Sequence, residues 1–306
     1  MPRGVRAMIT IRKKLKGLIP YRIVWFPSDA ALRSLAEELP LTHIARVECA
    51  SADVSGTAST VIEHHLSLTL CVELRRSLDE IFSRFSSTTR NLIRRAEKLG
   101  SRIRLRRHDA SAENTGMVDE FVEFFNELVR HKHGALFPMS RQLAHSYFPH
   151  AELSLLDFDD RLLCAHLCMR DPEAGKVRLL YSVSRRFQDP DTSRVAGIAN
   201  IYLHWLEFQK YRETGFAMYD LGGISPVDDP GINRFKLQFG GELVREHNYW
   251  LAGTPIIGNS AFALITKLTG RGKRRRAVQR AGERWRDLPL EEIRRDIERP
   301  SARPSH

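Results

Sequence analysis

Apolar residues recur along residues 113–251 with two different periods, and the changes of period outline a series of helices and strands. Five large apolar residues repeat at the spacing of one helix face: Met117, Phe121, Phe124, Phe125 and Leu128. Three alternating runs predict strands: 152–158, 162–169 and 177–187. The other predicted elements are helices over 142–148, 198–211 and 230–239 and strands over 216–221 and 243–251.

Residues 20–110 carry weaker versions of the same patterns. They predict strands over 21–26, 61–74 and 103–107 and helices over 28–38, 77–85 and 88–99. In the second half, consecutive strands precede a crossing helix, which indicates a mixed sheet with helices on both faces. We therefore expect an α/β (α+β) fold.

The net charge of +11 is concentrated at the two ends of the chain. Residues 1–16 carry six basic residues and no acid, and residues 270–306 carry twelve basic and six acidic residues. The body between them has a net charge of −1. This distribution argues against a uniformly basic nucleic-acid-binding fold.

The remaining composition favours a soluble protein with reduced cysteines. No run of about 18 apolar residues predicts a membrane span, and no signal peptide is recognisable, so we expect a cytoplasmic protein. Its basic ends could bring it to the inner face of the membrane. The four cysteines are interpreted as buried thiols. His64 and His65 show no third metal ligand in the sequence, so no metal is expected.

The first candidate site is the predicted strand that ends at Asp220, Leu221, Gly222 and Gly223. Paired glycines allow positive φ angles and the close approach of a ligand to the backbone. Strand ends of this kind are common ligand sites in α/β sheets. Asp220 could orient or deprotonate an amine there. Alternatively, it holds the loop through backbone hydrogen bonds.

The second candidate is the segment Arg234-Phe235-Lys236, which Phe239 and a second glycine pair follow. A cation beside an aromatic ring suits a phosphate, a tRNA 3′ end or a developing oxyanion. The alternative is that Phe235 and Phe239 are core residues at helical spacing, with Lys236 in solvent.

The third candidate is the pattern of Arg194, Gly197 and Ala199 before the long helix of the second half. A helix N-terminus presents N–H groups to an anion, glycine allows close approach, and arginine adds charge. The alternative is an ordinary helix start capped by Thr192 or Ser193.

The fourth candidate is a row of cations on the predicted helix 88–99. Arg90, Arg94 and Lys98 lie at i, i+4 and i+8, so one face of the helix is basic. Like charges at this spacing are mildly unfavourable, which suggests an anionic partner such as a phosphate group or tRNA. A solvated charged face is the alternative.

Residues 219–242 resemble the closing part of the acyl-transfer domain in FemAB-type peptidoglycan-bridge aminoacyltransferases and their BioF2-like acetyltransferase relatives. Residues 90–100 resemble the arginine-rich helix that precedes this domain in the family. The element order of the second half is similar to the GNAT acyltransferase fold. The resemblance implies two tandem GNAT-like halves, of which the first is degenerate. The expected domains are then a basic segment 1–19, a degenerate half 20–110, an acyltransferase domain 111–253 and a basic, partly helical and partly disordered tail 254–306.

The resemblance implies an N-acyltransferase that moves an acyl group from acyl-CoA to an amine of a cell-envelope or exopolysaccharide precursor. Such an acceptor carries phosphate, as a nucleotide-linked or lipid-linked glycan precursor does. Lys236 and Asp220 are the expected catalytic residues. Donor binding is expected at Arg194, Gly197, Ala199, Tyr181 and Ser182. Acceptor binding is expected at Phe235, Arg234, Gly222, Gly223, Arg90 and Arg94.

Two alternatives stay open at this point. In one, the fold is unchanged and the donor is aminoacyl-tRNA, with a peptidoglycan precursor as acceptor. In the other, the chain is a non-catalytic protein that binds RNA or an anionic membrane surface through its basic ends.

Overall fold

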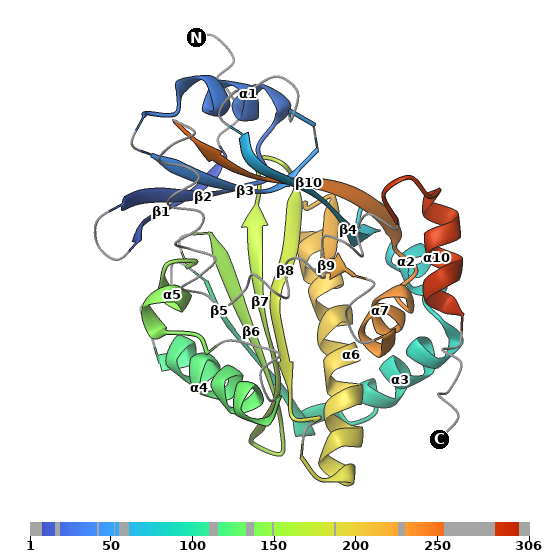
Figure 1. The fold of residues 1–306 in the computed structure, drawn as a ribbon. Helices are drawn as coiled ribbons and strands as arrows, with labels where there is room; N and C mark the ends of the chain where they lie inside the picture. Colours follow the sequence, from blue (N-terminus) through green and yellow to red (C-terminus); the bar gives the residue numbers. More distant parts are fainter. Residues whose placement is uncertain are drawn as a thin grey trace, which may run out of the picture. The chain divides into compact units, whose positions relative to one another are not determined.

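The computed structural model covers the chain and describes its residues in eleven segments (Figure 1). These segments are 8–15, 19–41, 43–51, 53–54, 61–109, 116–132, 138–148, 150–186, 188–225, 230–253 and 285–299. Most of the expected basic segment 1–19 and of the expected tail 254–306 lies outside the described residues. The chain forms two compact units. The first unit comprises Met1–Leu70, Gly223–Leu237 and Glu242–His306, and the second comprises Cys71–Gly222 and Gln238–Gly241.

The first unit is built on a sheet with the strand order β1-β2-β3-β10-β4. Its elements are β1 (Ile9–Leu15), β2 (Ile19–Trp25), α1 (Asp29–Glu38), β3 (Ile44–Ala50), β4 (Val61–Glu73), α7 (Pro230–Leu237), β10 (Glu242–Ala252) and α10 (Leu290–Glu298). The pairs β1–β2 and β3–β10 are antiparallel, whereas β2–β3 is parallel. Helix α1 begins at its cap Ser28 and packs Leu32 and Leu35 into a core with β2, β3 and β10.

Two strands and one packed helix of this unit differ from the sequence expectation. Strands β1 and β3 were not predicted, because cations or a charged pair interrupt their apolar residues. Helix α10 lies in the stretch 254–306 that was expected to be a basic, partly helical and partly disordered tail. Instead, Trp285, Ile293 and Ile297 are buried, and α10 packs against α7 and β10.

The second unit contains a mixed sheet with helices on both faces. Its elements are α2 (Leu78–Ser83), α3 (Ser87–Glu97), the 3₁₀ turn η1 (Gly100–Arg102), β5 (Ile103–His108), α4 (Gly116–His131), α5 (Arg141–His145), β6 (Ala151–Phe158), β7 (Arg161–Asp171), β8 (Lys176–Ser184), α6 (Pro190–Glu213) and β9 (Met218–Ile224). The strand order is β9-β8-β7-β6-β5, with β8–β9 parallel and the other pairs antiparallel. This arrangement confirms the predicted α/β fold with a mixed sheet.

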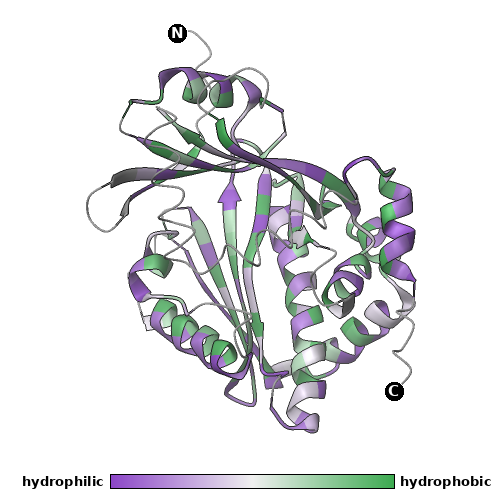
Figure 2. Ribbon diagram, viewed as in Figure 1, coloured by the Kyte–Doolittle hydropathy of each residue, from purple (hydrophilic) through white to green (hydrophobic). Residues whose placement is uncertain are grey.

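The helices cover the sheet with their apolar faces. Helix α4 buries Phe121, Phe124 and Phe125 and leaves polar residues outside, and both kinds are visible along it in Figure 2. On β8, Tyr181 meets Phe125 of α4, whereas the next residue, Ser182, bonds to Asn200 of α6. Because successive strand residues point to opposite faces, α4 and α6 cover opposite faces of the sheet. Within the described residues, no helix is long and apolar enough to span a membrane.

Gly240 lies at a close contact between the segment after α7 and the end of α2, within the second unit. Its φ is +65°, and a Cβ built on it would lie 2.3 Å from the carbonyl oxygen of Arg84. Gly215 at the end of α6 also has a positive φ, +86°, but a Cβ there would meet nothing within 4 Å. A side chain at Gly240 would therefore cause both backbone strain and steric overlap, whereas a side chain at Gly215 would cause backbone strain alone.

We predict that Gly240→Ala lowers the free energy of unfolding by about 3–5 kcal/mol, because it combines left-handed strain with overlap against main chain. Gly215→Ala is the matched control and should cost only about 1–2 kcal/mol, the strain alone. Urea unfolding followed by circular dichroism measures both. Equal losses for the two variants would contradict the tight contact at Arg84.

Candidate functional site

The parallel strands β8 and β9 separate after a short stretch of pairing. Their register covers only three pairs, from Lys176↔Met218 to Arg178↔Asp220, although β8 continues to Ser184. Among the described residues, β8 from Leu179 onward has no register partner in β9. An edge of strand backbone therefore faces the opening between two parallel strands, where ligands commonly bind in α/β sheets.

A β-bulge lies in β8 at the start of this opening. Leu167 of β7 pairs with Tyr181, and the next residue, Cys168, pairs with Leu179, so Leu180 is the extra residue. Bulges bend a strand and redirect its side chains and N–H groups, and they are frequent beside active sites. The bulge is followed by Tyr181 and Ser182, the two residues that the sequence analysis assigned to donor binding.

Asp220 lies where the β8–β9 pairing ends, and both its carboxylate oxygens are engaged. Oδ2 forms an ion pair of 2.5 Å with Arg178 Nη1, and Oδ1 accepts the N–H of Gly222 at 2.7 Å. Gly222 itself has a φ of +82°, a conformation that favours glycine. These contacts give Asp220 a structural role, as in the alternative left open from the sequence, but they hold Gly222 within β9 rather than a loop. Its role in proton transfer stays a prediction.

Helix α6 begins earlier than the sequence suggested. Its cap is Asp189, whose side chain accepts the N–H of Thr192 at 2.9 Å, and Pro190 is its first residue. This hydrogen bond lowers the pKa of Asp189. The expected caps, Thr192 and Ser193, are helical residues instead. Proline fits the first helical turn because it needs no N–H partner there, and this sets the start of the helix at residue 190.

Arg194, Gly197 and Ala199 consequently lie inside α6 rather than in the loop before it. The Arg194 side chain is 69% exposed, with Asp191 at 4.0 Å. Gly197 is buried, and a Cβ there would lie 3.0 Å from the guanidinium of Arg186. Because Gly197 has no side chain, the exposed Arg186 can pack against the helix at this position. Arg186 is therefore a second cation in this region, beside Arg194.

The basic face of α3 is partly used in holding the second unit together. Arg90 Nη1 donates to the carbonyl oxygens of Ser83 and Phe85 at the end of α2. Arg94 lies 5.3 Å above the ring of Phe82. The Arg90 side chain therefore stabilises the turn between α2 and α3. The roles predicted for Arg90 and Arg94 in acceptor binding stay predictions.

In the first unit, α7 is fastened to the segment that follows Gly222. Lys236 Nζ donates to the carbonyl oxygen of Gly223 at 2.6 Å, and Asn233 Nδ2 donates to that of Ser225 at 2.8 Å. Lys236 is therefore fixed by a backbone acceptor and is more than a solvated charge. The catalytic role of Lys236 and the acceptor-binding roles of Phe235 and Arg234 stay predictions. Phe239, in the second unit, is a core residue at 1% exposure.

A buried polar network links four elements of the second unit. Glu207 of α6 accepts the hydroxyl proton of Tyr219 of β9 at 2.6 Å and lies 2.9 Å from Nδ1 of His166 on β7. His166 Nε2 lies 3.1 Å from Oδ1 of Asn200, which also accepts from the Ser182 hydroxyl at 3.3 Å. The network thus connects the core to the site on β8. This network was not predicted from the sequence, because the residues that bond to one another are 12 to 41 positions apart.

The same network includes Cys168, whose Sγ lies 3.5 Å from the Tyr219 hydroxyl and 3.9 Å from Glu207. Burial raises the pKa of the Cys168 thiol well above its usual value, and the nearby Glu207 carboxylate adds to this shift. All four cysteines are free and buried. Their burial as free thiols is what was expected from the sequence.

We predict that Tyr219→Phe lowers the free energy of unfolding by about 1.5–3 kcal/mol, because it removes a hydrogen bond to a buried carboxylate. Tyr202→Phe, on the same helix as Glu207 but half-buried, is the control and should change stability by about 0.5 kcal/mol or less. Chemical denaturation with a common slope measures both values. A Tyr219 variant as stable as the control would show that Glu207 does not depend on this bond.

The comparisons with known proteins agree with this arrangement. FemX has a similar structure, with a TM-score of 0.53 at 14% identity over 81% of this chain and 85% of that chain. The C-terminal domain of a putative lysylphosphatidylglycerol synthetase from Agrobacterium fabrum gives a TM-score of 0.53 at 13% identity, over 85% of this chain and 84% of that chain. At these identities the likeness shows a shared fold. No curated protein matches the sequence.

The family comparison identifies the chain. Residues 83–237, just over half of the 306 residues, match the model of the acetyltransferase (GNAT) domain. This range contains the β8–β9 opening, helix α6 and Lys236. Together with the shared fold, the match confirms the predicted FemAB-like GNAT resemblance. The chain belongs to the acetyltransferase (GNAT) domain family and is an acyltransferase.

Proposed function

We propose that this protein is an N-acyltransferase that uses acyl-CoA to acylate an amine of a cell-envelope or exopolysaccharide precursor. The observation that carries the proposal is the early separation of β8 from β9, with a bulge at Leu180 beside the opening. The donor's acyl carbonyl lies against the β8 edge, where backbone N–H groups stabilise the oxyanion of the tetrahedral intermediate. Holding the amine against the carbonyl supplies the rest of the rate enhancement.

In this reaction the acceptor nitrogen forms a bond to the acyl carbon, and the C–S bond of the thioester breaks. The nitrogen loses one proton to solvent, and the leaving coenzyme A thiolate takes up a proton from solvent, so the products are an amide and free coenzyme A. The resemblance of residues 219–242 to the FemAB-type domain supports Lys236 as the catalytic cation, and its Nζ donates to the Gly223 carbonyl oxygen. Asp220 holds this end of the β8–β9 pairing, because it forms an ion pair with Arg178 of β8 and accepts the N–H of Gly222 in β9.

The family match supports a thioester donor, because the model is that of an acetyltransferase domain. Arg194 and Arg186 supply positive charge along the N-terminal half of α6. Gly197 leaves room for the Arg186 guanidinium, whereas Ala199 packs in the core against Leu163 and Cys164, so it does not line this surface. A diphosphate is the expected partner for two neighbouring arginines.

A second donor, aminoacyl-tRNA, is favoured by the first turn of α6. Pro190 has no N–H, and the carboxylate of Asp189 already accepts the N–H of Thr192. Asp191 adds another carboxylate to this turn. A diphosphate placed directly at the helix end would meet fewer donors and more negative charge than at an ordinary helix N-terminus.

The acceptor is proposed to carry phosphate, as a nucleotide-linked or lipid-linked glycan precursor does. Exposed cations on α3, including Arg94, Arg95 and Lys98, support this part of the proposal. Membership of an acyltransferase family makes a purely RNA-binding or membrane-binding role the weaker interpretation. The basic chain ends would then serve to keep a cytoplasmic enzyme near anionic membrane lipid.

We predict that acetyl-CoA at about 100 times its Kd stabilises the protein by about 2.7 kcal/mol and raises Tm by roughly 5 °C or more. Arg194→Ala should reduce this shift, because its side chain is largely exposed and its loss leaves the core intact. Arg95→Ala on α3 is the matched control and should keep the full shift. Differential scanning calorimetry gives the result.

Two outcomes would contradict the donor assignment. A full shift in Arg194→Ala would remove this arginine from the donor site. If neither coenzyme A nor acetyl-CoA raised the Tm of the wild-type protein, the thioester donor would be excluded. A filter-binding measurement with aminoacyl-tRNA would then test the second donor.

We predict that Lys236→Met lowers turnover about 10²–10³-fold, measured as coenzyme A release in the presence of an amino-sugar acceptor. Methionine keeps most of the side-chain length and removes the charge. Lys132→Met, at the exposed end of α4, is the control and should leave turnover unchanged. Turnover of the Lys236 variant within about threefold of wild type would overturn the assigned role.

A further inference from the structure

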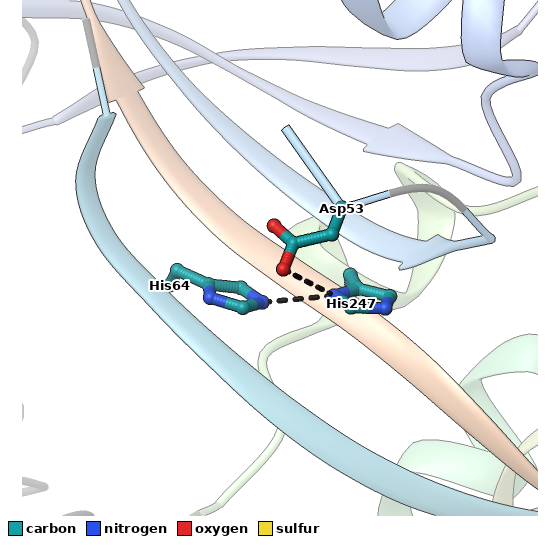
Figure 3. A group of neighbouring side chains, drawn as sticks. All are labelled: Asp53, His64 and His247. Atoms are coloured by element: carbon teal, nitrogen blue, oxygen red, sulfur yellow. Dashed lines mark hydrogen bonds and ion pairs between the residues drawn. The ribbon is translucent and has the colours of Figure 1, made fainter. Parts of the chain in front are cut away.

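Two histidines and an aspartate from distant parts of the sequence converge in the first unit. His64 lies on β4, His247 on β10, and Asp53 follows β3 (Figure 3). His64 Nε2 lies 2.9 Å from His247 Nδ1, and Asp53 Oδ2 lies 4.0 Å from the same His247 nitrogen. One ligand atom from each residue lies within 4.8 Å of the other two. From the sequence, no third ligand was expected for the pair His64 and His65, because His247 is 183 residues away from His64.

We propose that Asp53, His64 and His247 form a binding site for a divalent transition-metal ion, with Zn²⁺ as the first candidate. Two imidazoles and one carboxylate are a donor set that suits Zn²⁺ and other transition metals. In a tetrahedral site with bonds of about 2.0–2.1 Å, neighbouring ligand atoms are about 3.3 Å apart. The atoms observed at 2.9 and 4.0 Å need only small rotations to reach this spacing.

The backbone around His247 fixes its position. The β3–β10 register shifts between His247 and Tyr249, and on β3 the shift includes Cys49, with a φ of 59°. Asn248 holds this bulge, because its Oδ1 accepts the Cys49 N–H at 3.0 Å and its Nδ2 donates to Ser67 at 2.7 Å. A bulge pinned on both sides directs His247 toward β4.

An outer shell orients the other two groups. The Tyr249 hydroxyl donates to Asp53 Oδ1 at 3.2 Å and accepts the N–H of Val54 at 3.0 Å. The His64 ring stacks on Tyr249 at 4.8 Å and on His247 at 5.1 Å. Metal sites commonly hold their carboxylate and imidazole ligands through such second contacts. Oδ2 of Asp53 faces the histidines while Oδ1 is held by tyrosine.

Exposure also suits an ion. The Asp53 side chain is 49% exposed and that of His247 is 18% exposed, so an ion can enter from solvent and keep water as a further ligand. Asp53 supplies one negative charge to the site, whereas the positive charge of Arg286 near His64 opposes a cation. The other His–His–carboxylate group, His166, His204 and Glu207, is fully buried, and both His166 nitrogens already have partners.

Such an ion would join β4, β10 and the turn after β3 within one unit. These three segments are separated by up to 194 positions in the chain, from Asp53 to His247. Because the unfolded chain does not hold the three ligands together, binding would stabilise the folded unit. This inference does not depend on the donor or acceptor of the acyl transfer.

The test uses the full chain after EDTA treatment and removal of the chelator. Isothermal titration with Zn²⁺ should give one site per chain, and excess Zn²⁺ should raise Tm by about 5 °C at 100 times the Kd. Co²⁺ should give visible absorption bands from the same site. Tyr249→Phe should weaken Zn²⁺ binding by roughly 10–100-fold, and His247→Gln and Asp53→Asn by more.

His65→Gln is the matched control. His65 neighbours His64 on β4 but points to the opposite face, where Glu48 and Arg46 act on it. It should bind Zn²⁺ as wild type does. Circular dichroism establishes that each variant is folded before titration. Zn²⁺ binding that is absent in wild type, or equal in His247→Gln and His65→Gln, would overturn the site and leave the pair as a hydrogen bond between two imidazoles.

Discussion

The buried carboxyl group of Glu207 is the contact on which the candidate acyl-transfer site depends. It is 0% exposed, and it joins α6 to β9 through Tyr219 and to β7 through His166. Burying a carboxyl group costs several kcal/mol unless hydrogen bonds compensate, so these partners must be retained together. The sheet can then separate β8 from β9 at one end without loosening the helix that covers both. Asn200, one further contact away, extends the same network to Ser182 beside the opening.

The start of α6 combines two features that favour different donors. Its first turn carries Asp189, Pro190 and Asp191, which stabilise the helix itself and leave few N–H groups for an anion. One turn later, Gly197 accommodates the guanidinium of Arg186, and Arg194 extends into solvent. A diphosphate is therefore better placed along the side of the helix than at its end. The choice between a thioester and an aminoacyl ester rests on these arginines rather than on the helix dipole.

Much of the fold was predictable because its strongest signals are local. The phenylalanines of α4 and the alternating residues of β6 to β8 predicted these elements of the second unit. The order of strands and helices along this half of the chain predicted the mixed sheet and the fold class. Strand β1 was missed because Arg12, Lys13 and Lys14 made it resemble a basic tail. Strand β3 was missed because Arg46 and Glu48 interrupt its apolar residues, although they pair with each other. The packing of Ile293 depends on α7 and β10, which no pattern within its own helix reveals.

The site residues show where local patterns stop being informative. The glycine pair at Gly222 and Gly223 was predicted to end a strand, but β9 continues through both glycines to Ile224. Gly222 has a φ of +82°, which is costly for other residues. The contact of Asp220 with Arg178 depends on a parallel register across 42 residues, and a sequence pattern carries no information about register at that distance. The same limit applies to His64 and His247, whose convergence is set by a bulge at Cys49 and by the amide of Asn248. Chemistry that depends on such convergence becomes visible only when strand order and register are known.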